Sequence, residues 1–429
     1  MDVDMKAPKR KFQETQIMLN PATYSVSLKA EKFQYLLPQM QSVIAEKSMK
    51  QSYFAQDSYA HTVTAVAVIN SGSAFIDPHC SYLSFVLPDP SVTTATSASI
   101  KSIHDLIDQV TVYHKSGKEL DRIENYSLYR NKVDLYRYKT NYFNGPGSLE
   151  GYADRRYAAP TSIDVLASTY DSVRWQIPLA KLCPIFDCER GKLIPPHLMT
   201  GMRIEIRWKT PADAFKTNAG TVDSYALNQI RFSLSSYQLQ DRYIAELNKI
   251  AATKGLEWHW NSVFHTTFAT GSQNNVLQIT KKCSKLNGVH VVPQLDSILS
   301  TPTADADASV DLDLVASFQT RLGSQLYPCA PLENSREMFQ NTLQYFGKTC
   351  YHSDCPLRVE DVTGGSTDGI LSQTLERSAV LSISGQPVRS DRSLEVRLNF
   401  TGAVNRTTSC YLEFTKVARV TLQNVIVSE

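Results

Sequence analysis

Short segments in which apolar and polar residues alternate are the feature that most restricts how this chain can fold. In Arg203–Trp208 (RIEIRW) every second residue is large and apolar, and Ser393–Phe400 (SLEVRLNF) has the same pattern. Cys410–Val427 alternates in the same way. A period of two places alternate side chains on opposite faces of a strand, so each segment predicts a β-strand with one buried face. Further strands are expected at Tyr82–Leu87, Gln109–Tyr113, Val173–Ile177, Gln229–Leu234, Trp258–Phe268, Val276–Thr280, Val289–Val292 and Val315–Leu322.

Helical spacing is confined to three places. Apolar residues step by three or four over Ile100–Val110, Tyr129–Tyr136 and Phe339–Phe346. The third has a start signal, because Asn334 can cap it and Glu337 follows three residues later. Helices and strands do not alternate regularly, which excludes a doubly wound α/β fold. The pattern therefore predicts an all-β protein with a few short helices in its loops.

The length of 429 residues exceeds what one hydrophobic core usually organises, so two β domains are expected. The polar stretch Lys209–Ser224 separates two strong strands near the middle and is the candidate linker. We therefore expect an arm over residues 1–20, a first sandwich over 21–215 and a second over 216–429. The segments Met202–Trp208 and Arg392–Leu398 share an apolar-Glu-apolar-Arg-apolar core, which hints at duplication, although unrelated alternating strands resemble one another as readily.

The charge balance excludes one class of function. Forty-four basic against forty-two acidic side chains give a formal charge of +2, which argues against a protein that wraps nucleic acid along its whole surface. The exception is a short basic arm with Lys6, Lys9, Arg10 and Lys11. It matches a nuclear-localisation pattern or a tether to an acidic partner, and a solvated tail explains it equally well. No apolar run has the length of a membrane span or a signal-peptide core.

Sequence patterns of catalysis and cofactor binding each fail at a needed residue. Gly145–Glu150 has glutamate where a dinucleotide fingerprint needs its third glycine, and Gly364–Asp368 lacks the second glycine of a nucleophile elbow. The acidic stretch Asp305–Asp313 lacks the turn glycine of a calcium loop. His104 and His265 lie within apolar patterns, where a structural imidazole is the default. We therefore expect no enzyme activity and no cofactor.

The cysteines leave one metal site open. Cys183 and Cys188 are spaced C-x4-C, and Cys350 and Cys355 repeat that spacing around His352. A shared zinc site, and a zinc-dependent enzyme built on it, is conceivable. The spacing is looser than that of most zinc knuckles, and free cysteine is among the most buried residue types, so packing roles and no bound metal are expected.

An aromatic cluster has two interpretations. Trp258, Trp260, Phe264 and Phe268 could stack on the bases of single-stranded nucleic acid. Such platforms interleave aromatic residues with lysine and arginine, which are absent between these four. A strand with large side chains in the core is the favoured interpretation.

Several stretches, in their order and spacing, resemble the double jelly-roll major capsid proteins of tailless icosahedral double-stranded DNA viruses. The resemblance is to the proteins of virophages, polinton-like viruses and the nucleocytoplasmic large DNA virus lineage, and it extends from about residue 20 to the end. It is carried by DPHCSYLSFVL (77–87), VYHKSGKE (112–119), IPLAKLCPIF (177–186) with LIPPHLMTGMRIEI (193–206), RLGSQLYP (321–328) and a closing strand pair after Gly385.

This resemblance implies two tandem antiparallel eight-stranded jelly rolls standing upright on a capsid floor. Three copies would form a pseudo-hexagonal capsomer, and the long loops 141–161, 297–309 and 361–373 would build turrets or subunit contacts. The basic arm would lie on the inner face, toward core components. The implied partners are the homotrimer, neighbouring capsomers and minor capsid or penton proteins, in the virion and in the host cytoplasm or nucleus during assembly. The alternative is a non-enzymatic β-sandwich module that binds a carbohydrate or a protein.

Overall fold

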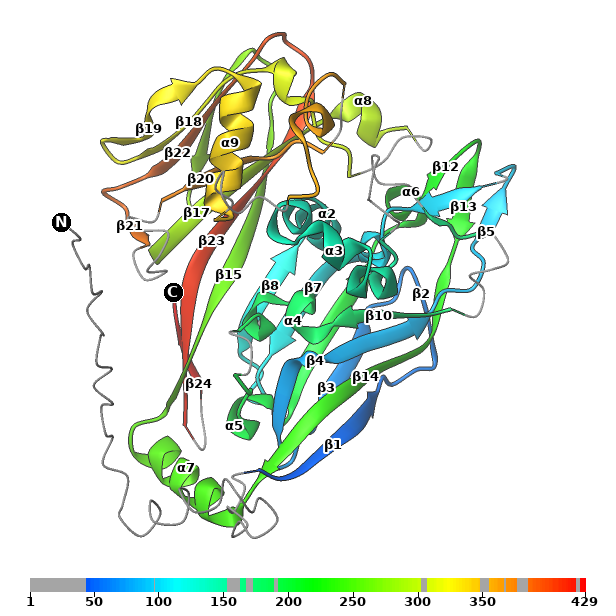
Figure 1. Ribbon diagram of the computed structural model, residues 1–429, viewed down its shortest axis with the longest axis vertical. Helices are drawn as coiled ribbons and strands as arrows, with labels where there is room; N and C mark the ends of the chain where they lie inside the picture. Colours follow the sequence, from blue (N-terminus) through cyan, green and yellow to red (C-terminus); the bar gives the residue numbers. More distant parts are fainter. Residues whose placement is uncertain are drawn as a thin grey trace, which may run out of the picture.

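Antiparallel strand pairs build both halves of the computed structural model (Figure 1). The structure describes residues 44–95, 97–152, 163–166, 173–188, 192–301, 307–347, 355–365, 368–375, 385–421 and 425–429. The expected arm over residues 1–20, with its four basic residues, therefore lies outside the described residues. None of the described helices is long and apolar enough to span a membrane.

The first half is a sandwich of two sheets. The larger sheet has the order β1 (Ile44–Tyr53), β14 (Ala226–Leu239), β4 (Phe75–Val86), β10 (Arg174–Pro178), with β2 (Ser58–Ala60) beside β14. The other has the order β3 (Ala65–Ile69), β11 (Met202–Trp208), β7 (Ile107–Tyr113), β8 (Glu119–Glu124). Two small sheets flank them: β12 (Lys216–Thr217), β6 (Ala98–Ile100), β9 (Ile163–Asp164), and β13 (Thr221–Ser224), β5 (Ser91–Thr93).

The second half repeats this plan. Its larger sheet has the order β15 (Leu256–Ala269), β23 (Arg406–Val420), β17 (Cys283–Leu295), β20 (Leu371–Thr374), with β21 (Gln386–Val388) beside β17 and β24 (Val425–Ser428) beside β23. The facing sheet has the order β16 (Asn274–Ile279), β22 (Leu394–Phe400), β18 (Val315–Leu322), β19 (Gln325–Leu332).

Strand order is the same in the two halves. In the larger sheets the first strand of each half pairs with its last long strand, β1 with β14 and β15 with β23. In the facing sheets β3 pairs with β11 and β16 pairs with β22, which is the same order once the short strands β2, β12 and β13 are left out. This is the order of a jelly roll, so the prediction of two tandem eight-stranded jelly rolls is confirmed. The strands β11 and β22, whose sequences hinted at duplication, occupy the same place in their sheets. The two rolls are topological repeats.

The core follows the predicted alternation. Met202, Ile204, Ile206 and Trp208 of β11 are buried, whereas Arg203 and Arg207 are exposed. In β22 every second residue from Leu394 to Phe400 is buried. Buried apolar residues of both rolls belong to one cluster, so the hydrophobic core continues from one half into the other.

Most helices lie in connections between strands. The longest are α2 (Tyr126–Arg137), α7 (Asp241–Thr253) and α9 (Ser335–Tyr345); the short ones are α3 (Thr140–Phe143), α4 (Leu179–Leu182), α5 (Pro196–Met199), α6 (Pro211–Ala214) and α8 (Asp296–Leu299). Single 3-10 turns are η2 (Ile103–Leu106), η3 (Pro146–Glu150), η4 (Pro184–Phe186), η5 (Leu312–Leu314) and η6 (Val359–Asp361). Helices α2 and α9 were predicted, and Asn334 caps α9 by accepting a hydrogen bond from the Arg336 amide.

Two predictions about the chain course were wrong. Within Ile100–Val110, Ile100 ends β6, Ile103–Leu106 form a 3-10 turn and Ile107 begins β7. Pairing of β7 with β11 and β8 outweighs the local helical spacing. The boundary between residues 215 and 216 lies inside the first half, because β14 pairs with β1, β2 and β4. The proposed linker Lys209–Ser224 forms α6, β12 and β13 of the first half, and α7 connects the rolls.

One edge of the second roll has an unusual sequence. Strand β19 lies at the edge of its sheet, with β18 as its partner there, and each of its residues is exposed or half-buried. It contains Pro328 and Pro331, which have no backbone N–H to donate.

Candidate functional site

Helix α2 lies between the two rolls (Figure 1), and its residues from Tyr126 to Tyr136 are all buried. A helix enclosed on every side is normally apolar, yet α2 carries Arg130, Asn131, Lys132 and Asp134. Burying such groups is costly unless each finds a partner. The partners come in large part from the second roll. The contacts of α2, together with the other buried polar contacts between the two halves, are here called the seam.

The first acidic residue of the seam is Asp307, which is buried in the second half. Its carboxylate accepts hydrogen bonds from Ser127 Oγ at 3.2 Å, Asn131 Nδ2 at 2.7 Å and Lys209 Nζ at 3.1 Å, all from the first half. Burial alone would raise the pKa of Asp307, but Lys209 and these hydrogen bonds outweigh it and hold the pKa below its ordinary value.

The second acidic residue, Asp368, is held by lysines of the first half. Its Oδ1 lies 3.1 Å from Lys132 Nζ and 3.4 Å from Lys101 Nζ. Lys132 is fully buried, so its ammonium depends on this carboxylate for charge compensation. Beside this pair, the ring of Tyr136 stacks on Phe346, 5.8 Å between centroids, which adds an aromatic contact across the seam.

The third acidic residue is Glu413 on β23. It accepts hydrogen bonds from the hydroxyls of Tyr129 and Tyr345, each at 2.5 Å, and from Arg137 Nη2 at 3.2 Å, and His290 Nε2 lies 3.2 Å away. Burial alone would raise the pKa of Glu413, but His290, Arg137 and Tyr129 outweigh it and hold the pKa far below its ordinary value. Glu413 is therefore a carboxylate that joins α2, β17, β23 and α9.

A reciprocal contact runs from the first half to the second. Asp121 on β8 is fully buried and accepts hydrogen bonds from Trp260 Nε1 at 3.0 Å and Ser262 Oγ at 2.5 Å, both on β15. The amide of Ile185 donates to the same carboxylate at 3.0 Å, and Lys416 Nζ lies 3.5 Å away. Burial raises the pKa of Asp121 despite these partners. Acidic residues of both halves therefore accept hydrogen bonds across the seam.

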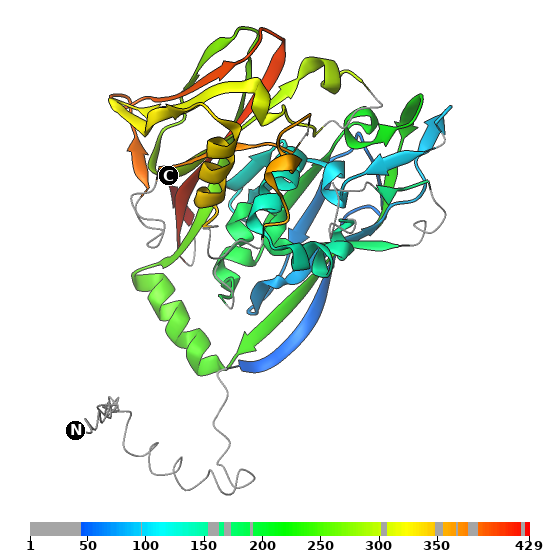
Figure 2. The same cartoon turned by 45° about the horizontal axis from the view of Figure 1, so that its top comes forward.

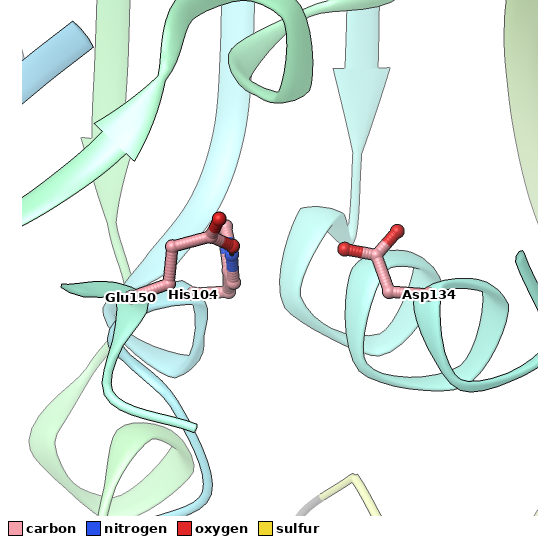
Figure 3. A group of neighbouring side chains, drawn as sticks. All are labelled: His104, Asp134 and Glu150. Carbon is pink, nitrogen blue, oxygen red and sulfur yellow. Dashed lines mark hydrogen bonds and ion pairs between the residues drawn. The ribbon is translucent and has the colours of Figure 1, made fainter. Parts of the chain in front are cut away.

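One group of side chains next to the seam has the composition of a metal site. His104, Asp134 and Glu150 are buried, and one ligand atom of each lies within 4.8 Å of the others (Figure 3). Lys181 Nζ occupies the place of a cation there, 2.9 Å from Asp134 Oδ2 and 2.8 Å from Glu150 Oε2. His104 completes the group through Tyr126 Oη at 3.0 Å and Glu150 Oε2 at 2.8 Å. These residues do not fit a metal ion, because an ammonium already neutralises the carboxylates.

The pKa values of this group agree with a closed ion-pair cluster. Burial lowers the pKa of His104, which favours the neutral imidazole. Burial also disfavours the ammonium of Lys181, but Asp134 and Glu150 raise its pKa well above the ordinary value. The cluster is a structural support for α2, which carries Asp134.

The metal site that the cysteine spacing left open is not assembled by the cysteines that the structure describes. Cys183 is buried with Sγ 3.6 Å from Asp121 Oδ2, Cys188 donates to Lys192 O, and Cys350 lies outside the described residues. Burial raises the pKa of Cys183 well above its ordinary value and that of Cys188 to about 11, so both are thiols and poor metal ligands at neutral pH.

Other candidates from the sequence also have structural explanations. Trp258 and Trp260 are each 3% exposed, so they belong to the core and offer no stacking surface. His265 stacks on Tyr411 at 4.7 Å between ring centroids. Asp307 from the acidic stretch belongs to the seam, and Lys6, Lys9, Arg10 and Lys11 lie outside the described residues.

Sequence reasoning missed the seam. One signal was available in β23, where Cys410, Tyr411, Leu412 and Phe414 are consecutive or nearly consecutive apolar residues on both faces. A strand with two apolar faces is covered on both sides, so Glu413 had to be buried and paired. Its partners on α2 lie more than 270 residues away and could not be identified from the pattern.

Comparisons with known proteins agree with this architecture. No family model matches the sequence, and no curated protein matches it. Among solved structures, the chain is similar to the capsid model of PBCV-1 virus at 11% identity, with 92% of this chain and 99% of that chain covered and a TM-score of 0.62. The Faustovirus major capsid protein is 7% identical over 92% and 94% of the two chains, TM-score 0.60. The Sputnik virophage structure is 10% identical over 90% and 89%, TM-score 0.58. At these identities the likeness shows a shared fold.

Proposed function

We propose that this chain is a major capsid protein whose homotrimers form the pseudo-hexagonal capsomers of an icosahedral virus shell. The observation that carries the proposal is the pair of jelly rolls with one strand order, joined by a buried seam. The fold shared with the PBCV-1, Faustovirus and Sputnik capsid structures supports it.

The seam explains how such a subunit would work. Three copies of a two-roll chain present six similar rolls, which approximates a hexagon only when the two rolls of each copy keep a fixed relative orientation. Asp307, Asp368, Glu413 and Asp121 connect the halves at separate places along α2 and β15. Several buried charge-assisted contacts at different points resist rotation better than an apolar contact, because each requires its own geometry.

The expected partners follow from this role. Trimer interfaces of this kind typically bury roughly 2,000–5,000 Å² and are apolar, whereas contacts between capsomers are smaller and more polar. The basic residues Lys6, Lys9, Arg10 and Lys11 would face core components on the inner side, and minor capsid or penton proteins would complete the shell. The protein would reside in the virion and, during assembly, in the cytoplasm or nucleus of the host.

The alternative of a carbohydrate-binding sandwich has little support. Such sites stack sugars on exposed aromatic rings, and all four tryptophans (Trp175, Trp208, Trp258 and Trp260) are only 3–4% exposed. The contacts of the seam favour a structural role over ligand binding.

The mass of the purified protein in solution tests the proposal. Multi-angle light scattering should give three times the 48.0 kDa of one chain, and negative-stain images should contain pseudo-hexagonal particles. A monomer that persists at tens of micromolar, without larger particles, would contradict it. Disruption of the seam by Glu413→Ala should reduce the trimer fraction, whereas Glu257→Ala, an exposed residue of β15, serves as the matched control.

A further inference from the structure

Helix α7 connects the two rolls and has few contacts with either. It runs from the end of β14 toward β15 at one end of the molecule (Figure 2). Ala251 is its one buried residue. Its polar contact with the first roll is a hydrogen bond between Asn248 Oδ1 and His197 Nε2 at 2.8 Å, and its last turn is followed by Lys254, whose carbonyl accepts from Arg419 Nε at 2.9 Å.

One face of α7 is apolar. Tyr243, Ile244, Leu247, Ile250 and Ala251 recur at the spacing of a single helical stripe, here called the α7 stripe. Ala251 is buried and Tyr243, Ile244 and Leu247 are half-buried, whereas Ile250 is 47% exposed. In the part of the chain that the structure describes, none of the five belongs to the main hydrophobic cluster or packs against it. A helix of this length is only marginally stable in water by itself, so further packing on the incompletely buried α7 stripe would stabilise it.

The chain itself provides a segment at the right place. Ile44, the first described residue, pairs with Leu239 at the end of β14, two residues before α7 begins at Asp241. The 43 residues that precede Ile44 are therefore attached beside the first turn of α7. Helix α7 is about 20 Å long at 1.5 Å per residue. As a helix, residues 33–43 would span about 16 Å, which is close to the length of α7.

The sequence of this segment is complementary to the α7 stripe. Phe33, Leu36, Leu37 and Met40 are spaced at i, i+3, i+4 and i+7, which places four large apolar side chains on one side if the segment is helical. Linkage through a short chain raises the effective concentration of the segment near α7 to the millimolar range. Modest apolar affinity is then sufficient for docking.

We propose that residues 33–43 dock on the α7 stripe of the same chain. This contact would hold residues 33–43, the part of the N-terminal arm next to Ile44, at the end of the molecule where α7 connects the rolls. Its direction of approach follows from the pairing of Ile44 with Leu239. The proposal does not depend on the capsid function, because it rests on the exposure of α7 and on the attachment of the arm.

Hydrogen exchange of the intact protein tests the contact in both directions. The double variant Leu36→Asp and Leu37→Asp should speed exchange of the α7 amides about tenfold, because the variant carries charges where apolar side chains would pack. Conversely, Leu247→Asp with Ile250→Asp should speed exchange of residues 33–43. The four-residue control Lys6→Ala, Lys9→Ala, Arg10→Ala and Lys11→Ala should change neither. All variants are first checked for wild-type circular dichroism and mass in solution, which keeps a folding defect apart from loss of the contact.

A short bifunctional crosslinker then identifies the chain that supplies the segment. With Cys80 and Cys329 replaced by serine, cysteines introduced at Gln34 and Ala245 should become crosslinked to each other within one chain. The expected result is a band at the mass of a single chain from which mass spectrometry recovers the two cysteine peptides joined by the linker. A product of two chains would mean that another copy covers the α7 stripe and would overturn the proposal. Unchanged α7 exchange in the Leu36 and Leu37 variant would overturn it too. So would α7 protection that arises only after addition of phosphatidylcholine–phosphatidylserine vesicles, which would assign the stripe to a lipid surface.

Discussion

Replacement of Glu413 by alanine should be among the most destabilising single changes in this protein. The substitution removes the acceptor of the Tyr129 and Tyr345 hydroxyls and one of the two acidic partners of Arg137. Breaking a buried charge pair by removing one partner costs about 3–5 kcal/mol. The hydroxyls could add about 1–3 kcal/mol each if left unpaired. Because the contributions of groups in contact do not add and Arg137 keeps Asp187 as a partner, we expect a total of about 3–5 kcal/mol.

The isosteric change Glu413→Gln separates charge from shape. It keeps one oxygen acceptor, so a loss of about 1–3 kcal/mol is expected at pH 7. The pKa of Glu413 is held far below its ordinary value, so its charge stabilises the fold above the unfolded pKa of about 4.3 and this contribution is lost as the pH falls toward the folded pKa. The stability difference between wild type and Glu413→Gln should therefore narrow below about pH 4.

Urea unfolding followed by tryptophan fluorescence measures both effects, since Trp258 and Trp260 lie on β15 at the seam. Glu257→Ala on the same strand is the matched control, because its side chain is 55% exposed. The reasoning fails if Glu413→Ala and Glu257→Ala unfold within about 0.5 kcal/mol of each other. It also fails if the gap between wild type and Glu413→Gln is the same at pH 7 and pH 3.

Three further outcomes follow from the contacts described. Asp121→Ala should cost about 3 kcal/mol in urea unfolding, because Trp260 and Ser262 lose their buried acceptor; a loss below about 1 kcal/mol would contradict the closed seam. Gly288→Ala should cost about 1–3 kcal/mol by thermal unfolding, because the added Cβ would collide with the Tyr345 ring and the Gln373 carbonyl oxygen; a raised melting temperature would contradict this. Metal analysis of purified protein should find less than about a tenth of an equivalent of zinc, because Lys181 fills the one group of suitable geometry among the described residues; stoichiometric zinc would refute it.

The elements that could be predicted from sequence are those fixed by local pattern. Strands β11 and β22 alternate cleanly because one face of each meets the core and the other meets water. Helix α9 has both an apolar spacing and the Asn334 cap, so its position followed from its own residues. In these elements the immediate neighbours along the chain and the tertiary environment favour the same structure.

Prediction failed where a distant strand decides the outcome. Residues 107–110 carry a helical spacing, yet β11, about a hundred residues later, offers a ladder that a helix could not use. The domain boundary was misplaced because β14 returns to pair with β1, and nothing in the sequence of β14 identifies its partner. In a jelly roll, many strands that are neighbours in a sheet are far apart in the sequence.

The seam could not be predicted from the sequence for a different reason. Helix α2 has the composition of a surface helix, with Arg130, Lys132 and Asp134 among its residues. Polar residues at such spacing normally face water, and burial is possible only because the acids of the second roll are positioned to receive them. The matching groups come from separate, distant parts of the chain, so no single stretch contains the complementary pattern.

The prolines of β19 limit how molecules of this protein can associate along that border. A row of free amide hydrogens and carbonyls invites a strand from another molecule, and two residues without an amide hydrogen interrupt that row. The prolines therefore disfavour a continuous β-sheet that extends from β19 into a neighbouring molecule. Such sheets can grow into open-ended polymers that dissociate slowly. Neighbouring molecules would contact this border through side chains. Such contacts can form and break individually.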